Sequence, residues 1–320
     1  MPITFAQAQQ LSQPKLTKQV IDQFRTSALI DALTFDNTVK AAGGNSLDYV
    51  YNRVTTSPNA ASRVLNADYT ASEAVTTAIT SRLAIFGGSF QLDRALILGE
   101  HEAVDHVQFQ VQQKVQATIA QFHNMFINGN QVAPVILNSW EFDGLNVLLT
   151  GGAQEINPAN PIMLDTSANV TANWQAFLDQ LRELEARMDG EPTAYLMNRA
   201  MYAKFQSVMD RAGINLASKE NYGRNVSVWG NSLVMALGNV PGNANPIIAT
   251  DNNGRTSIYA VRLGMDGVHG VSLAGGKLAD VYLPNMQDSA AVKTGAVEMI
   301  AGIAYTSTQS AAVLRNIDIA

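Results

Sequence analysis

The feature that most constrains this chain is a single apolar stripe in its first half. Seven apolar residues recur there at intervals of three or four, which places them on one face of an α-helix. They are Val104, Val107, Val111, Val115, Ile119, Phe122 and Phe126. Asp93 can serve as an N-cap and Asn128-Gly129 as a stop signal, so the sequence predicts a helix over 93–128. A helix of this length spans about 50 Å, although Gly99 can interrupt its first turns.

The chain before this helix contains two segments without a core of their own. Residues 1–45 are typical of an arm that carries one short amphipathic helix around Phe24. Residues 46–82 contain two β-prone pieces, Leu47 to Tyr51 and Val75 to Ile79, on either side of a polar stretch. An isolated hairpin is at best marginally stable in water. We therefore expect this hairpin to lie against other protein.

The chain after the long helix mixes helices and strands, which predicts an α+β fold. An apolar stripe between 174 and 188 indicates a second helix. A strand over Thr193 to Met197 leads into a third helix, with Asn198 as its N-cap and Gly213 at its C-terminal end. Strands dominate the remainder, and the final segment reads as two strands around residues 306–310.

Charged residues are scarce, which indicates a surface that ends up against protein. The 21 Lys and Arg and 27 Asp and Glu make 48 charged side chains, or 15 % of the 320 residues, where a soluble domain of this length carries about 80. The net charge of −6 makes the chain a poor candidate for nucleic-acid binding through counterion release. Its long uncharged stretches are broken by Asn, Gly and Pro, so we expect no membrane-spanning segment.

No sequence motif indicates an enzyme. There is no cysteine, which excludes a thiolate nucleophile and a Cys-ligated metal. His101 and His106 stand five residues apart, about 140° around a helix, whereas a zinc-binding helix needs an i, i+4 pair. Gly275-Gly276-Lys277 lacks the first glycine and the hydroxyl residue of a phosphate-binding loop. We therefore expect no catalytic residue, no cofactor and no metal site. A metal-dependent hydrolase that uses the two histidines is the weakest alternative.

Four short segments carry a resemblance to a known family. In chain order they are Gly87-Gly88-Ser89-Phe90-Gln91-Leu92-Asp93-Arg94, Glu141-Phe142-Asp143-Gly144-Leu145, Tyr195-Leu196-Met197-Asn198 and Ala312-Val313-Leu314-Arg315-Asn316-Ile317. Together with the order of arm, hairpin, long Gln-rich helix and closing strands, they resemble the major capsid proteins of tailed bacteriophages. These proteins have the fold named after the Hong Kong ninety-seven phage.

The resemblance implies a division of the chain into four parts. The expected parts are an N-terminal arm (1–45), an extended loop (46–82), a peripheral domain (83–145 and 285–320) that contains a spine helix (93–128), and an axial domain (146–284) that faces the fivefold and sixfold axes.

The function that the resemblance implies is structural. The expected protein is a major capsid protein that assembles with itself, through pentamers and hexamers, into an icosahedral head around double-stranded DNA, without sequence-specific binding. The expected location is the virion, and the host cytoplasm during assembly. Further expected partners are a portal protein, a decoration protein and a scaffolding protein encoded separately, because the arm begins almost at Met1. The main alternative is the shell of a bacterial nanocompartment of the encapsulin type, which packages an enzyme.

The way in which such a shell is locked can also be predicted. The namesake phage joins its subunits through a lysine on the extended loop and an asparagine on a neighbour, and this chain has no lysine between Lys40 and Lys114. The basic residues of the loop are Arg53, Arg63 and Arg82, and a guanidinium stays protonated and cannot attack an amide. We therefore expect these three arginines to make non-covalent contacts between subunits.

Overall fold

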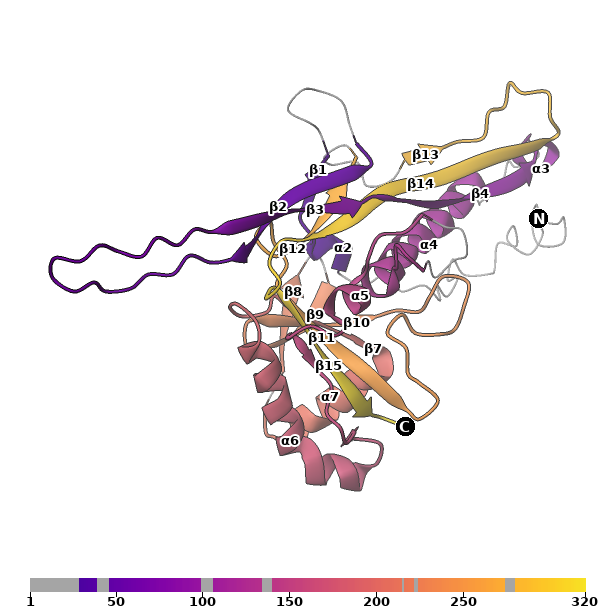
Figure 1. Cartoon of the computed structure of the whole chain (residues 1–320). Helices are drawn as coiled ribbons and strands as arrows, with labels where there is room; N and C mark the ends of the chain where they lie inside the picture. Colours follow the sequence, from indigo (N-terminus) through magenta and orange to yellow (C-terminus); the bar gives the residue numbers. More distant parts are fainter. Residues whose placement is uncertain are drawn as a thin grey trace.

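The computed structural model of the protein describes residues 29–38, 46–98, 106–133, 140–214, 216–221, 224–273 and 280–320. Two β-sheets lie one above the other in Figure 1 and meet near the middle of the molecule, and a long hairpin projects away from both of them. The mixture of helices and sheets confirms the predicted α+β class.

The first sheet has five strands and is built on the 14-residue strand β14. Strand β14 pairs with β4 along one edge and with β12 and β13 along the other, and β1 extends the sheet beyond β12. Helix α4 lies along this sheet (Figure 1). The elements of this part are α2 (Leu29–Ala32), β1 (Phe35–Asn37), β4 (Ala84–Asp93), α3 (Arg94–Leu98), α4 (His106–Asn128), α5 (Leu145–Leu149), β12 (Val268–Ser272), β13 (Asp280–Tyr282) and β14 (Val292–Tyr305).

The second sheet has eight strands in the order β5-β15-β11-β7-β10-β9-β8, with β6 also paired to β15. Helices α6 and α7 pack against it, and the Asn198 side chain caps α7 by accepting a hydrogen bond from the Met201 amide at 2.7 Å, as the sequence predicts. The elements are β5 (Glu155–Ile156), β6 (Ile162–Met163), α6 (Ser167–Ala186), β7 (Ala194–Asn198), α7 (Arg199–Arg211), β8 (Ala217–Asn221), β9 (Arg224–Trp229), β10 (Ser232–Leu237), β11 (Arg255–Val261) and β15 (Ala311–Asp318).

Strand β7 joins the two hydrophobic cores of the molecule. All five of its residues are buried, and they alternate between opposite faces of the sheet. Ala194 and Leu196 belong to the core that includes the C-terminal half of α4, whereas Tyr195 and Met197 belong to the core beneath α6 and α7. The second sheet is therefore covered on both faces, which fixes its position relative to α4.

The long helix agrees with the prediction in its second half and differs in its first. The described residues contain α3 and α4, and residues 99–105 between them, with Gly99 and His101, lie outside the described residues, so one continuous helix over 93–128 stays a prediction. Phe122 and Phe126 are fully buried, whereas Val111 is only half-buried. The reason is that the end of α4 enters the core shared by both sheets, while its beginning packs on the first sheet alone.

The closing strands divide between the sheets, unlike the expected domains. Residues 285–320 were expected in one unit with the long helix, but β15 lies in the second sheet between β11 and β5. Conversely, β12 and β13 come from the range 146–284 and pair with β14 in the first sheet. Burial patterns in a sequence indicate that a strand is covered on both faces, but they do not specify the sheet in which it pairs.

We predict that the α4 core is sensitive at Phe122. The Phe122 ring lies 5.9 to 6.3 Å from the rings of Phe35, Phe86, Phe126 and Phe142, so Phe122→Ala leaves a cavity and costs about 3–5 kcal/mol of unfolding free energy. The exposed Gln112 provides a control, since Gln112→Ala should change that free energy by less than about 0.5 kcal/mol. Urea unfolding of the unassembled chain measures both. Equal losses would mean that the packing of α4 is misassigned.

Candidate functional site

The projecting hairpin is the most unusual feature of the surface. Strands β2 (Asp48–Thr56) and β3 (Val75–Arg82) pair with each other and, within the described residues, with no other strand. Their register runs from Asp48 opposite Arg82 to Thr56 opposite Val75. Residues 57–74 form a tip in which every side chain is exposed. As Figure 1 shows, the tip lies far from both sheets.

The tip holds its shape through contacts within itself. The Ser72 hydroxyl accepts a hydrogen bond from the Asn59 amide and donates one to the Asn59 carbonyl, both at 2.8 Å. Arg63 donates to the Ala67 carbonyl at 3.1 Å, and its guanidinium carbon lies 5.5 Å from the centre of the Tyr69 ring. These contacts order the loop but leave its apolar side chains in water.

The base of the hairpin is attached to the first sheet by alternate side chains of β2. The Tyr51 hydroxyl donates to the Tyr305 carbonyl at 3.0 Å and accepts from the Tyr305 amide at 3.3 Å. Arg53 donates to the carbonyls of Tyr305 and Thr306, in the latter case from Nε at 3.2 Å. Its guanidinium carbon lies 5.2 Å from the centre of the Tyr305 ring. We call Tyr49, Tyr51 and Arg53 the hairpin anchor.

Tyr49 provides the third contact of the hairpin anchor. Its hydroxyl donates to Oδ2 of Asp36 on β1 at 2.8 Å, and its ring meets the ring of His269 on β12 edge to face, with 5.9 Å between the centroids. Burial, followed by the hydrogen bond to Asp36, raises the pKa of Tyr49 to about 12. Burial also lowers the pKa of His269 below its ordinary value, against the opposing influence of the Asp36 carboxylate. The phenol and the imidazole are therefore both neutral at pH 7.

Exposed large apolar side chains gather at two distant places. The hairpin carries seven that expose 39 to 84 % of their surface, namely Leu47, Val50, Val54, Val64, Leu65, Tyr69 and Val75. At the opposite end of the molecule (Figure 1), a second set exposes 38 to 66 %, namely Val281, Tyr282, Leu283, Met286 and Val292. We call this second set the edge patch. Exposed apolar groups gathered in this way mark protein contact surfaces.

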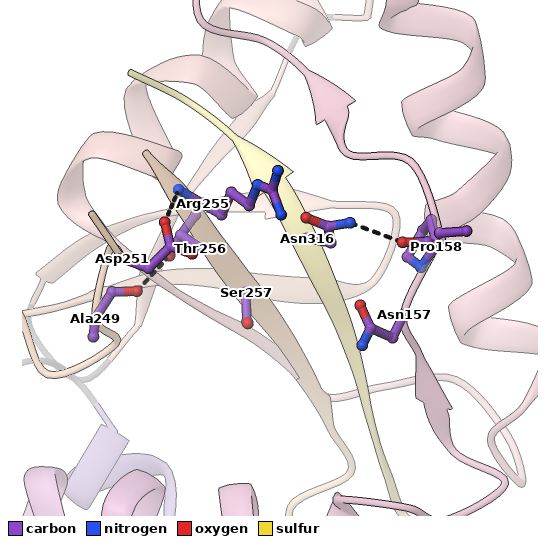
Figure 2. A pocket seen from close by; sticks show the side chains of 9 residues that line it. Asn157, Pro158, Ala249, Asp251, Arg255, Thr256, Ser257 and Asn316 are labelled. Carbon is purple, nitrogen blue, oxygen red and sulfur yellow. Dashed lines mark hydrogen bonds between the residues drawn. The ribbon is translucent and has the colours of Figure 1, made fainter. Parts of the chain in front are cut away.

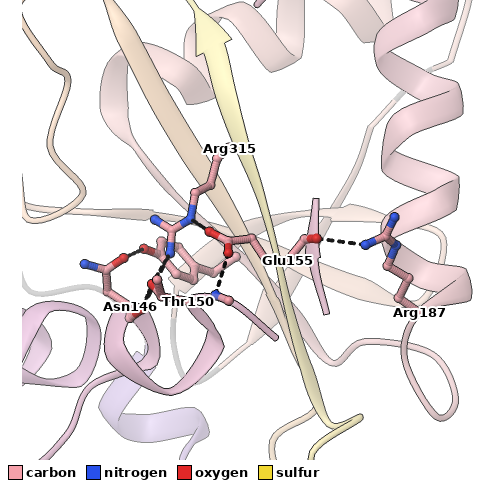
Figure 3. A network of polar contacts seen from close by, with 7 residues as sticks. Asn146, Thr150, Glu155, Arg187 and Arg315 are labelled. Atoms are coloured by element: carbon pink, nitrogen blue, oxygen red, sulfur yellow. Dashed lines mark hydrogen bonds and ion pairs between the residues drawn. The ribbon is translucent and has the colours of Figure 1, made fainter. Parts of the chain in front are cut away.

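A polar network secures the second sheet to α5 (Figure 3). The Arg315 guanidinium forms an ion pair with Glu155, and both side chains are largely buried. Arg315 also donates to the Thr150 hydroxyl at 2.9 Å, and Glu155 accepts from the Gly151 amide at 2.7 Å. Every charged group here has a partner inside the chain, so the network serves the structure of the subunit.

An open cavity of about 520 Å³ lies beside the start of β11 and the end of β15 (Figure 2). It is lined by Asn157, Pro158, Ala159, Ala249, Asp251, Arg255, Thr256, Ser257 and Asn316. Asp251 accepts hydrogen bonds from the amides of Asn253 and Arg255, both at 2.8 Å, which lower its pKa. This carboxylate therefore organises a turn, and the lining does not pair it with a histidine or a second carboxylate.

The three arginines expected between subunits have different surroundings. Arg53 is directed into its own chain by the hairpin anchor. Arg82 lies with its guanidinium carbon 4.1 Å from the centre of the half-exposed Trp140 ring. Arg63 is the one of the three that is exposed, at the tip. Sequence reasoning missed Tyr49, Tyr51 and His269, although the alternation of Tyr49, Tyr51 and Arg53 indicates that one face of the strand is covered.

The described residues contain no group of three or more His, Asp or Glu side chains that could hold a metal ion. The second histidine of the sequence pair, His106, begins α4, and His101 lies outside the described ranges. In the same part of the chain, no helix combines the length and the apolar character that a membrane crossing needs.

Comparisons with known proteins find similar structures but no match by sequence. No family model matches the chain, and no curated protein matches it. Among solved structures, the chain is similar to the SrpI encapsulin of Synechococcus elongatus PCC 7942, with a TM-score of 0.65 at 16 % identity over 99 % of this chain and 97 % of that one. It is also similar to the capsid of an empty GTA particle, with a TM-score of 0.58 at 13 % identity over 98 % of each chain.

A third similar structure, from Mycobacterium phage Bobi, gives a TM-score of 0.58 at 10 % identity over 98 % of this chain and 99 % of that one. The chain has the Hong Kong ninety-seven fold. The similarity covers nearly the whole length of each protein, so it includes the hairpin and both sheets. The fold that the sequence resemblance implies is therefore confirmed.

We predict that Arg53 stabilises the subunit and that Arg63 does not. Arg53→Ala removes charged donors from two backbone carbonyls and should lower the unfolding free energy by about 1.5–3 kcal/mol. Arg63→Ala, at the exposed tip, should change it by less than about 0.5 kcal/mol. Urea unfolding of the unassembled variants measures both, and the opposite order would contradict the hairpin anchor.

Proposed function

We propose that this protein is a shell subunit, the major capsid protein of a tailed phage, which assembles with itself into an icosahedral head around double-stranded DNA. The observation that carries the proposal is the hairpin, which is anchored at its base and exposes Val64, Leu65 and Tyr69 at its tip. Exposure of these apolar side chains to water is unfavourable, and their burial against another copy lowers the free energy. The fold, shared with phage and encapsulin shells, supports the same conclusion.

Two different apolar surfaces at opposite ends of a subunit favour rings. When the hairpin of one copy contacts another surface of the next copy, the interface is heterologous, and a heterologous interface closes into a ring if the rotation permits it. Pentamers and hexamers are such rings. The edge patch and the uncharged face of β4 beside it, with Ile85, Gly87 and Ser89 exposed, are suited to receive a neighbour.

The scarcity of charge agrees with this function. Subunit interfaces are depleted in Lys, Asp and Glu relative to the rest of a protein surface, and a net charge of −6 keeps the subunit from binding tightly to the phosphates that it encloses. The proposed role needs no catalysis, no cofactor and no membrane. In this account the protein is located in the virion, and in the host cytoplasm during assembly, with portal, scaffolding and decoration proteins as its further partners.

A nanocompartment shell is the second candidate, and the similarity to an encapsulin over 99 % of this chain favours it. The two candidates differ in what the shell contains. Particles isolated from the natural source should contain double-stranded DNA if the protein is a phage capsid. A folded protein cargo without DNA would identify a compartment instead. Neighbouring genes for a portal and a terminase, or for a cargo enzyme, distinguish the candidates independently.

Assembly tests the shell proposal directly. Negative-stain microscopy of the expressed full chain should find shells or rings of five or six. Leu65 exposes 84 % of its surface, so Leu65→Asp should abolish these assemblies without changing the melting temperature of the free subunit. Leu65→Met keeps the tip apolar and should assemble normally. A monomer at every concentration, or normal assembly of Leu65→Asp, would contradict the proposal.

We predict that the shell contains no covalent links between subunits. The described hairpin contains no lysine, and the chain contains no cysteine. Particles boiled in detergent should therefore run as one band near 34.4 kDa. A ladder of covalent oligomers would reveal a cross-linking chemistry that this account lacks.

A further inference from the structure

We propose that His269 makes the attachment of the hairpin dependent on pH, so that acidification releases its base from the first sheet. The consequence for assembly rests on the proposed function. The attachment itself is a property of the single subunit and is tested there.

The environment of His269 is unusual for a titratable group. The residue is 1 % exposed, and in the part of the chain that the structure describes its ring nitrogens have no side-chain hydrogen-bond partner, with only the backbone of Gly264 close to the ring. Its ring plane stands at 87° to that of Tyr49, the residue of the hairpin anchor that lies on top of it. A histidine is therefore buried in its neutral form directly beneath the base of the hairpin.

Few groups face the imidazole from the elements around it. Strand β1 contributes the carboxylate of Asp36, and β2 contributes Tyr49, with Tyr51 behind it at 6.0 Å between ring centroids. The residue opposite on β14 is Ala304, which carries no charge, and the backbone of Gly264 approaches from the preceding turn. Asp36 is thus the charged group that responds to protonation.

Protonation of His269 weakens the contact with Tyr49 in two ways. A buried imidazolium that no side chain hydrogen-bonds is unfavourable and draws water toward the ring, which opens the covering hairpin. The positive charge also attracts the Asp36 carboxylate, which otherwise accepts the hydrogen bond of Tyr49. Tyr49 then loses both its hydrogen bond to Asp36 and its water-free packing on the ring of His269. Only Tyr51 and Arg53 of the hairpin anchor still hold the hairpin.

The direction of the pH dependence follows from burial. Because burial lowers the pKa of His269 in the attached state, the attached state binds fewer protons than the released state. Attachment is therefore complete above the ordinary histidine pKa of about 6.5 and is lost as pH falls below it. In that range the attachment constant falls by up to about tenfold per pH unit.

Hydrogen exchange on the unassembled full chain measures the release. Between pH 7.5 and pH 5.0, after correction for intrinsic exchange rates, the amides of β2 should lose protection on the order of tenfold or more, while those of α6 should not. His269→Phe keeps a ring beneath Tyr49 and cannot be protonated, so it should remove the pH-dependent loss. His123→Phe, at the other buried histidine of the described residues, should leave that loss unchanged.

A second variant keeps the proposal testable if His269→Phe does not fold. Asp36→Asn retains an oxygen that can accept from Tyr49 but removes the charge that favours imidazolium. The attached state then binds still fewer protons, so the loss of β2 protection on acidification should be at least as large as in the natural protein. Equal protection of β2 at both pH values in the natural protein would overturn the proposal, as would an undiminished loss in His269→Phe or a clearly smaller loss in Asp36→Asn. Failure of the chain to assemble would contradict the proposed function alone.

Discussion

The backbone at Tyr305 and Thr306 is the point on which the rest of this structure depends. Strand β14 ends there, and β15 begins at Ala311 in the other sheet, so the backbone groups between them need partners outside a ladder. Tyr51 and Arg53 provide donors for the two carbonyls, and the Thr306 hydroxyl donates to Gly267 at 2.7 Å. One short segment thereby holds the hairpin and both sheets in a fixed relation.

The chemistry of this attachment suits a subunit that must keep its shape in assembly. A phenol and a guanidinium bind backbone carbonyls at the junction, and such charge-assisted or buried hydrogen bonds are affected less by salt than exposed ion pairs are. The partly buried pair of Arg315 and Glu155 has the same role for α5 and the second sheet. Polar groups inside the subunit thus fix the positions of its parts, while its exposed apolar groups remain available for contact with other subunits.

The fold could be predicted from the sequence where local signals are strong. The stripe that ends at Phe122 and Phe126, the Asn198 cap and the coreless hairpin are local or periodic features, and the structure contains all of them. The sheet that β15 joins could not be predicted, because pairing between strands that are distant in sequence leaves no periodic signal.

The candidate site was predictable only in outline. The sequence places Arg53 on an exposed loop, where an outward ion pair is a reasonable expectation, but the nearby backbone of Tyr305 provides a stronger partner. His269 stands in a strand like any core residue, and its meeting with Tyr49 and Asp36 depends on three separate parts of the chain.

A cryo-electron microscopy reconstruction of assembled particles at neutral pH tests the central claim most directly. The account predicts that Val64 and Leu65 of each hairpin tip lie on a second copy of the chain, while Tyr51 and Arg53 keep their contacts with Tyr305 in their own subunit. A tip exposed to solvent in the finished shell, or a hairpin folded back onto its own sheets, would contradict it.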